Sequence, residues 1–302
     1  MSDTKKIIEK IAAGDFKTIA QTLTIVENNL GQCDDILMSL VNNTGTKIIG
    51  ITGPPGAGKS TLINALLLNL TAAQQKVAVL SVDPSSPFNF GALLGDRIRM
   101  SDFYLHPDVF IRSVASRGSL GGLSAHVIEM LEVLKSANFD YIFIETVGVG
   151  QSEVEIAGIA DTTIVTLVPE AGDEIQTMKA GVMEIADIFI VNKGDRNNAD
   201  EFVKNLKILA HNKAKEWEIP VIKTIASNNE GIPLVIKAME AHHQFTHYNK
   251  SRQLEMLTMK AFQLIQHKRM KDIQKDVLQL QIQTAMAKES FNLYQFVATY
   301  TK

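Results

Sequence analysis

Short apolar runs, bounded by turn residues, alternate with longer stretches of helical periodicity through the middle of the chain. We predict strands at 48–52, 77–82, 109–111, 141–145, 163–167, 188–191 and 221–224. This alternation predicts an α/β fold with a mainly parallel sheet, helices on both faces and right-handed crossovers. Ligands of such sheets bind at the carboxyl ends of the strands.

The two ends of the chain follow a purely helical pattern. Residues 1–45 are predicted to form an N-terminal helical extension, in which Gly14 breaks the first helix and Asp15 caps a second one. The apolar face of that second helix is predicted at Ile19, Leu23 and Val26.

Residues 236–302 contain no glycine or proline, and they predict a tail of two or three helices interrupted by the charged run 268–272. Its apolar stripe requires a partner, which is either the central domain at 46–235 or another chain. The stripe consists of Leu254, Leu257, Ala261, Leu264 and Ile265.

Composition narrows the class of protein. The 302 residues are 45% hydrophobic and carry a formal net charge of −3, so no electrostatic argument for a nucleic-acid partner follows. A single cysteine, Cys33, rules out an internal disulfide framework and suits a reducing compartment. Without an apolar signal core or a run long enough to span a bilayer, the sequence predicts a cytoplasmic enzyme with no membrane partner.

Residues 53–61 read Gly-Pro-Pro-Gly-Ala-Gly-Lys-Ser-Thr and match the phosphate-binding loop at every fixed position, between a predicted strand and a predicted helix. Backbone N–H groups of such a loop surround phosphate oxygens at the positive end of the helix. Lys59 is expected to reach the β- and γ-phosphates and Ser60 to ligate Mg²⁺. The predicted phosphate-binding residues are Gly53, Pro54, Pro55, Gly56, Ala57, Gly58, Lys59, Ser60 and Thr61.

Asn192, Lys193 and Asp195 form an N-K-x-D pattern directly after the strand at 188–191. The pattern resembles the guanine-specificity motif of GTPases. A carboxylate such as Asp195 accepts hydrogen bonds from guanine N1–H and the 2-amino group, whereas adenine offers no matching pair of donors. The chain is therefore expected to bind GTP rather than ATP.

Ser227 and Asn228 follow the last predicted strand, where GTPases place a backbone N–H against guanine O6. An ordinary turn, with Ser227 as a helix N-cap, explains the same spacing equally well. Both interpretations stay open at this point.

Glu145 ends the strand at 141–145, where an acidic residue holds Mg²⁺ through its water shell, and Gly148 is placed to meet the γ-phosphate. The alternative for Glu145 is a solvated carboxylate. Val149 occupies the position of the water-orienting glutamine of Ras-like enzymes, and valine cannot orient water. We therefore expect slow intrinsic hydrolysis.

Two further carboxylates are candidates for the surroundings of Mg²⁺. Asp83 ends the second predicted strand, and Asp96 follows soon afterwards. A turn-forming role before Pro84 is the alternative for Asp83, and a solvated charge beside Arg99 is the alternative for Asp96.

Together these segments resemble the MeaB/ArgK family of P-loop GTPases, chaperones of adenosylcobalamin-dependent acyl-CoA mutases, chiefly methylmalonyl-CoA mutase. The run 145–153 (Glu-Thr-Val-Gly-Val-Gly-Gln-Ser-Glu) is the most specific part of the resemblance. Further segments that carry it are 53–61, 81–86, 95–100, 117–122, 171–176 and 192–195.

The resemblance implies a G domain, often dimeric through a C-terminal arm, with Mg²⁺ near Ser60, Asp83, Asp96 and Glu145. It also implies that 171–179 is an additional switch that signals to the mutase and helps to trigger hydrolysis. The catalytic candidates are Lys59, Asp96, Gln176 and Lys179. One departure is Glu170, because many relatives have glycine at this position.

Three other functions fit parts of the sequence. A nickel-insertion GTPase would need metal ligands, for which the chain offers His242, His243 and His247, interpreted here as exposed polar residues. An ATP-dependent transport ATPase or kinase would not need Asp195 for guanine. The third alternative is a scaffold whose helical ends mediate assembly and whose nucleotide is structural.

Overall fold

The computed structural model describes residues 2–41, 45–83, 100–115, 125–146, 155–171, 180–211, 216–270, 272–273, 275–287 and 291–300. The chain divides into two compact units, Met1–Leu257 and Thr258–Lys302. The larger unit contains the sheet, the phosphate-binding loop at 53–61 and the N-K-x-D turn at 192–195.

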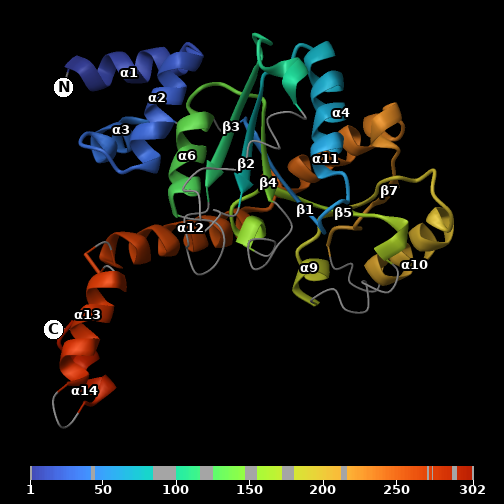
Figure 1. Cartoon of the computed structure of the whole chain (residues 1–302). Coiled ribbons are helices and arrows are strands. Elements are labelled where there is room, and N and C mark those ends of the chain that lie inside the picture. Colours follow the sequence, from blue (N-terminus) through green and yellow to red (C-terminus); the bar gives the residue numbers. More distant parts are fainter. Residues whose placement is uncertain are drawn as a thin grey trace. The chain divides into compact units, whose positions relative to one another are not determined.

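Seven parallel strands form one sheet in the order β3-β2-β4-β1-β5-β6-β7 (Figure 1). The predicted fold class is confirmed, and each of the seven predicted strands is present. The strands are β1 (Lys47–Thr52), β2 (Val77–Asp83), β3 (Val109–Ala115), β4 (Tyr141–Thr146), β5 (Thr162–Leu167), β6 (Ile188–Val191) and β7 (Val221–Lys223).

Helices cover both faces of the sheet, because both faces of its strands are apolar. In β6, Ile188 and Ile190 pack in the core with α4 (Lys59–Ala72) and α11 (Ile232–Tyr248). Phe189 and Val191, which point to the opposite face, belong to a second core with residues of α9 (Ala180–Glu184) and α10 (Ala199–His211). This period-2 alternation of two apolar faces is the pattern expected of a buried parallel strand.

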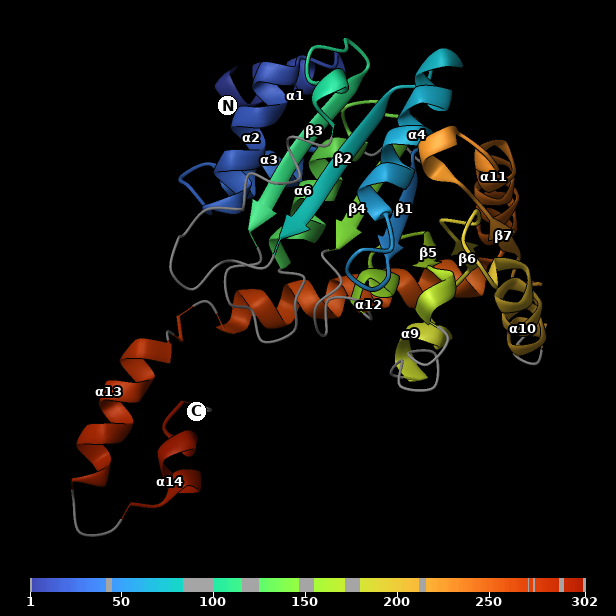
Figure 2. The same ribbon diagram turned by 45° about the vertical axis from the view of Figure 1, so that its right-hand side comes forward.

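The remaining elements lie around this sheet and in the C-terminal unit. Figure 2 shows β2, β3 and β4 running in the same direction, with their arrowheads at the side of the sheet where the loop before α4 lies. The other elements are α6 (Ala125–Lys135), α9 (Ala180–Glu184), α10 (Ala199–His211), η1 (Ser101–Phe103), η2 (Ile156–Gly158), η3 (Pro169–Ala171), η4 (Ala226–Asn228), α12 (Lys250–Met270), α13 (Lys275–Met286) and α14 (Leu293–Ala298).

Strand β3 is four residues longer than the apolar run 109–111 predicts. Arg112 interrupts that run, yet it lies within the strand and reaches the second N-terminal helix. Its guanidinium donates to the carbonyl of Ala20 at 3.1 Å and to the carboxylate of Glu27 at 2.6 Å. The two Nη groups of Arg112 thus bond to helix α2, and a pattern of hydrophobicity cannot reveal such a contact between a strand and a distant helix.

The N-terminal extension contains α1 (Ser2–Ala12), α2 (Phe16–Glu27) and α3 (Cys33–Ser39). Asp15 caps α2 as predicted, since its carboxylate accepts from the Thr18 N–H at 2.7 Å. The apolar face predicted for α2 is confirmed, because Ile19, Leu23 and Val26 are fully buried. The two helices α2 and α3 lie against α6 (Figure 1).

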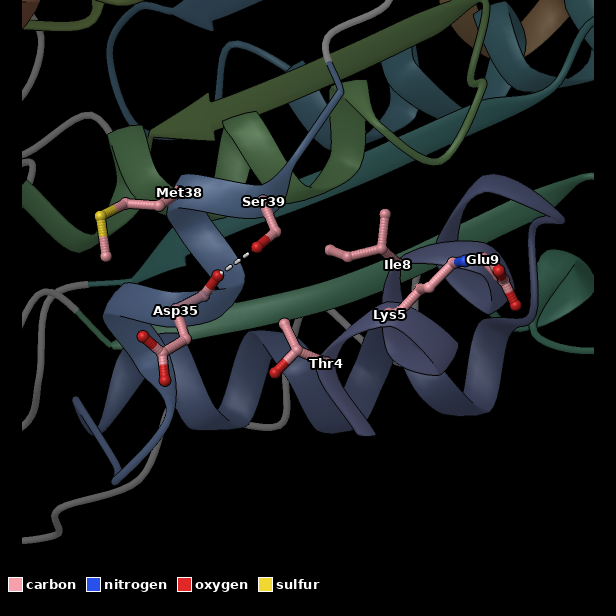
Figure 3. Close-up of a pocket in the computed structure, with 7 residues that line it drawn as sticks. All are labelled: Thr4, Lys5, Ile8, Glu9, Asp35, Met38 and Ser39. Carbon is pink, nitrogen blue, oxygen red and sulfur yellow. Dashed lines mark hydrogen bonds between the residues drawn. The ribbon is translucent and has the colours of Figure 1, made fainter. Parts of the chain in front are cut away.

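A groove of about 550 Å³ runs between α1 and α3 (Figure 3). Thr4, Ile8 and Met38 contribute to its lining, and Met38 is 77% exposed. The Ser39 hydroxyl on its wall already donates to the Asp35 carbonyl at 2.7 Å. The groove belongs to the N-terminal extension and not to the carboxyl edge of the sheet.

Helix α11 begins four residues before the predicted start of the tail. Gly231 supplies the N-cap with φ +79°, and a proline occupies the first turn, where its missing N–H is not needed. Farther on, α12 ends at Met270, inside the charged run that predicts an interruption. In the C-terminal unit, Phe262, Ile265 and Leu280 are more than half exposed.

None of the helices in the described residues is long and apolar enough to cross a bilayer.

Candidate active site

The loop between β1 and α4 closes around its own lysine. Gly58, in the left-handed conformation, is the N-cap of α4, and Lys59 is 6% exposed. The Lys59 ammonium donates to the carbonyl of Gly53 at 2.7 Å and to that of Pro54 at 3.1 Å. The charge thus lies inside the loop where the sequence predicts phosphate, at the positive end of a 14-residue helix.

Glycine is required at position 53 for a steric reason. Its φ is +138°, and a Cβ atom there would lie 2.1 Å from the backbone carbonyl oxygen of Thr166 on β5. Relieving such an overlap would require the backbone of the loop or of β5 to move, because the atom that is met is a backbone oxygen.

We therefore expect Gly53→Ala to lower the free energy of unfolding by about 3 kcal/mol, which combines overpacking with the cost of a positive φ. Gly56→Ala is the matched control, because Gly56 also has a positive φ (+77°) but open space around it. That variant should lose only about 1 kcal/mol. Urea denaturation of both variants measures the difference, and equal losses would contradict the steric argument.

Ser60, in the first turn of α4, contacts Glu145, near the carboxyl end of β4. The Ser60 hydroxyl donates to Glu145 Oε1 at 2.7 Å, and both residues are 4% exposed. The interpretation of Glu145 as a solvated carboxylate is therefore wrong. One hydroxyl and one carboxylate are hard oxygen ligands of the kind that Mg²⁺ prefers, so the donor set fits this ion.

Asp83 ends β2, which pairs with β4 in a register that places Val82 opposite Thr146. This register brings the backbone of Asp83 to the same edge of the sheet as Glu145. Its side chain is not described. The predicted residues Asp96, Gly148, Gln176 and Lys179, together with Val149, lie outside the described residues.

Asn192 joins three loops at this edge. Its Nδ2 donates to the carbonyl of Ala57 at 3.0 Å, while its Oδ1 accepts from the hydroxyl of Thr224 and from the N–H of Ala226, both at 3.1 Å. The residue is 3% exposed. Through these hydrogen bonds Asn192 connects the phosphate loop to the segments that follow β6 and β7. The four-residue motif in the sequence does not predict this role.

Asp195 lies in the same loop but in solvent. Lys193 adopts a positive φ of 57°, and the Gly194 N–H donates to the Thr224 carbonyl at 2.9 Å, which fixes the turn. Within the part of the chain that the structure describes, the Asp195 carboxylate makes no hydrogen bond or ion pair, and the residue is exposed. It is consequently available to an incoming ligand.

The structure separates the two interpretations of Ser227 and Asn228. The N-cap of α11 is Gly231 and not Ser227, so the capping interpretation is wrong. The Asn228 N–H donates to the Ile225 carbonyl at 2.9 Å and is already used. The Ser227 N–H has no acceptor among the described residues, and it is the better candidate donor to a ligand.

The three histidines of α11 do not form an exposed polar group, and that prediction is wrong for His242. This residue is fully buried, with Nδ1 2.8 Å from the hydroxyl of Thr162 and Nε2 3.2 Å from the carboxylate of Asp187. The helix face that packs on the sheet includes position 242, whereas His247 is exposed. No three His, Cys, Asp or Glu side chains within the described ranges are grouped so as to hold a metal ion.

These features define a class of protein. A parallel sheet carries a phosphate-binding loop after β1, a buried carboxylate at the end of β4 against the loop serine, and the N-K-x-D turn after β6. This arrangement is that of a P-loop nucleotide-binding protein with a guanine-specificity loop.

Comparison with known proteins gives the family. Residues 19–280 match the family described as methylmalonyl-CoA mutase-associated GTPase MeaB, and the chain belongs to this family. It is a GTPase, an enzyme that acts on GTP.

Two curated relatives illustrate the similarity. The GTPase ArgK of Escherichia coli is 37% identical over 238 residues, which cover 74% of this chain and 71% of ArgK. The methylmalonic aciduria type A homolog of Mus musculus, a mitochondrial protein, is 38% identical over 257 residues, covering 78% of this chain and 62% of the mouse protein.

One solved structure has the same fold. It is described as an LAO/AO transport system kinase and superposes with a TM-score of 0.72 at 24% identity, covering 100% of this chain and 97% of its own. At this level of identity the likeness concerns the fold alone.

Proposed function

We propose that this GTPase gates the delivery of adenosylcobalamin to an acyl-CoA mutase, methylmalonyl-CoA mutase in the first instance, and protects that mutase. The observation that carries the proposal is the set of loops joined at the carboxyl edge, together with the family to which the chain belongs. The similarity to a methylmalonic aciduria type A homolog supports the choice of client.

In this proposal the base, the phosphates and the ion have separate residues. Asp195 accepts from guanine N1–H and the 2-amino group, and the Ser227 N–H donates to O6. Lys59 neutralises the β- and γ-phosphates. Ser60 and Glu145, with Asp83 and Asp96, would hold Mg²⁺, which neutralises developing charge on the phosphates when bound.

The contact between Ser60 and Glu145 offers a way to register nucleotide state. Its length of 2.7 Å joins the first turn of α4 directly to the end of β4. If the serine hydroxyl turns to a ligand, the Glu145 carboxylate loses this hydrogen bond. We therefore expect that binding of a nucleotide at the phosphate loop changes the contacts of Glu145 at the end of β4, just before the segment 147–154.

We further propose that Gln176 and Lys179 supply the polar groups for hydrolysis that Val149 cannot provide. Slow intrinsic turnover, stimulated by the mutase, follows from such a division of labour. The C-terminal helices, with exposed residues such as Phe262 and Leu280, are proposed as the arm of a homodimer. In this proposal the chain consists of an N-terminal helical extension (1–45), a G domain (46–235) and a C-terminal helical arm (236–302).

The proposal is tested by GTP turnover with and without a purified adenosylcobalamin-dependent mutase, using ATP as the competitor. We expect slow GTP hydrolysis that rises when methylmalonyl-CoA mutase is added and that ATP does not inhibit. Unchanged hydrolysis with every such mutase would contradict the chaperone role while leaving the GTPase intact. Efficient competition by ATP would contradict the assignment of Asp195 to guanine.

A further inference from the structure

An ion pair joins two loops beside the guanine-specificity turn. Glu170 lies in η3, just after β5, and Arg196 directly follows Asp195. The guanidinium Nη1 of Arg196 donates to Oε1 of Glu170. Because β5 and β6 are neighbours, with Leu167 opposite Val191, this pair bridges adjacent loops at the carboxyl edge of the sheet.

The neighbourhood of Arg196 poses an electrostatic problem for base recognition. Its long, flexible side chain is attached one residue from Asp195, whose exposed carboxylate makes no ion pair with the described residues. A guanidinium forms strong charge-assisted hydrogen bonds with carboxylates. An unrestrained Arg196 would compete with guanine for the acceptor on which base selection depends.

We propose that Glu170 is a positioning residue for guanine recognition, which holds Arg196 away from Asp195 and keeps that carboxylate open to the base. The inference rests on the proposed role of Asp195. Glu170 stands where many relatives have glycine, and the proposed role would explain the glutamate in this chain.

The charge state of Glu170 agrees with this role. The hydrogen bond from Arg196 is the main cause that lowers the pKa of the Glu170 carboxyl, and the charges of Arg196 and Lys193 act in the same direction. Glu170 is therefore ionised at neutral pH. The pair is about half exposed, 45% for Arg196 and 51% for Glu170, so its effect should be modest and sensitive to salt.

The test is a double-mutant cycle read out as the affinity for GDP. Glu170→Gln keeps the size of the side chain but removes its charge, and it should weaken GDP binding about threefold to fivefold at low ionic strength. In the Arg196→Gln background the same change should have no effect, because the competing guanidinium is absent. High salt should abolish the difference between wild type and Glu170→Gln.

Inosine diphosphate provides a readout that a merely structural role would not change. It lacks the 2-amino group and so makes one hydrogen bond fewer to Asp195. The penalty of Glu170→Gln should therefore be smaller for inosine diphosphate than for GDP.

A penalty that persists in the Arg196→Gln background, equal penalties for the two nucleotides, or no penalty at all would overturn the proposal. The variant Asp195→Asn distinguishes this failure from a failure of the guanine site itself. If Asp195→Asn leaves GDP affinity unchanged, the assignment of Asp195 is wrong. If it weakens GDP binding while the cycle shows no coupling, only the role of Glu170 is lost.

Discussion

Asp195→Asn should lower the affinity for GTP by about 100-fold or more and should raise the affinity for xanthosine triphosphate (XTP). The carboxylate is expected to accept two hydrogen bonds from guanine, and each bond to a charged group contributes about 1.5–3 kcal/mol. An asparagine carbonyl still accepts from N1–H, but its amide NH₂ faces the 2-amino group, donor against donor. Xanthine carries a carbonyl at that position, which matches the amide.

Competitive binding of GTP, XTP and ATP to the wild type and the variant measures this change. Asp200→Asn is the matched control, since Asp200 is an exposed carboxylate on the adjoining α10 that pairs with Lys223 at 2.6 Å. It should leave the order of base preference unchanged. Retained GTP affinity in Asp195→Asn would show that guanine selection resides elsewhere.

Asp187→Ala should destabilise the fold by about 3–5 kcal/mol, the range for one partner removed from a buried ion pair. The Asp187 carboxylate lies just before β6, is 8% exposed, and accepts from Thr163 N–H at 2.8 Å and from Arg252 at 2.6 Å. The ring nitrogen Nε2 of His242 is 3.2 Å away. The substitution would leave the Arg252 guanidinium and the Thr163 N–H without their acceptor, and it would remove the carboxylate that faces His242.

Urea unfolding followed by tryptophan fluorescence checks this, because Trp217 is the single tryptophan and its Nε1–H donates to the Asp187 carbonyl at 2.8 Å. Asp140→Ala is the matched control. Asp140 also accepts from a backbone N–H, that of Lys76 at 2.8 Å, but in an exposed position. We expect a loss of about 1 kcal/mol there, and equal losses in both variants would refute the buried network.

The same residue predicts a dependence on pH. Burial acts to raise the pKa of Asp187, but the contacts with His242 and Arg252 and their charges outweigh burial, so the pKa lies below its ordinary value of 3.8. A lowered folded-state pKa stabilises the protein fully above the unfolded value, and this contribution is lost as the pH falls through the folded value. The stability difference between wild type and Asp187→Asn should therefore shrink below about pH 4. A difference that grows with acidity would contradict this sign.

The fold was largely predictable because its signals are local. The strands β4, β5 and β6 are buried on both faces, so an apolar run bounded by turn residues marks each of them directly, as at Ile188–Val191. The phosphate loop was equally readable, since glycines at fixed spacing before Lys59 reflect a backbone path that few other residues can follow. The capping of α2 by Asp15 is local in the same sense.

The order of residues alone is enough to predict the sheet, the phosphate loop and the residue types of the guanine motif. How these parts are joined is seen only once the chain is folded. Ser60 meets Glu145 across 85 positions, Asn192 meets Ala57 across 135, and His242 meets Thr162 across 80. No periodicity or spacing encodes such pairs, because whether a polar side chain is solvated or buried against a partner depends on which distant elements pack beside it.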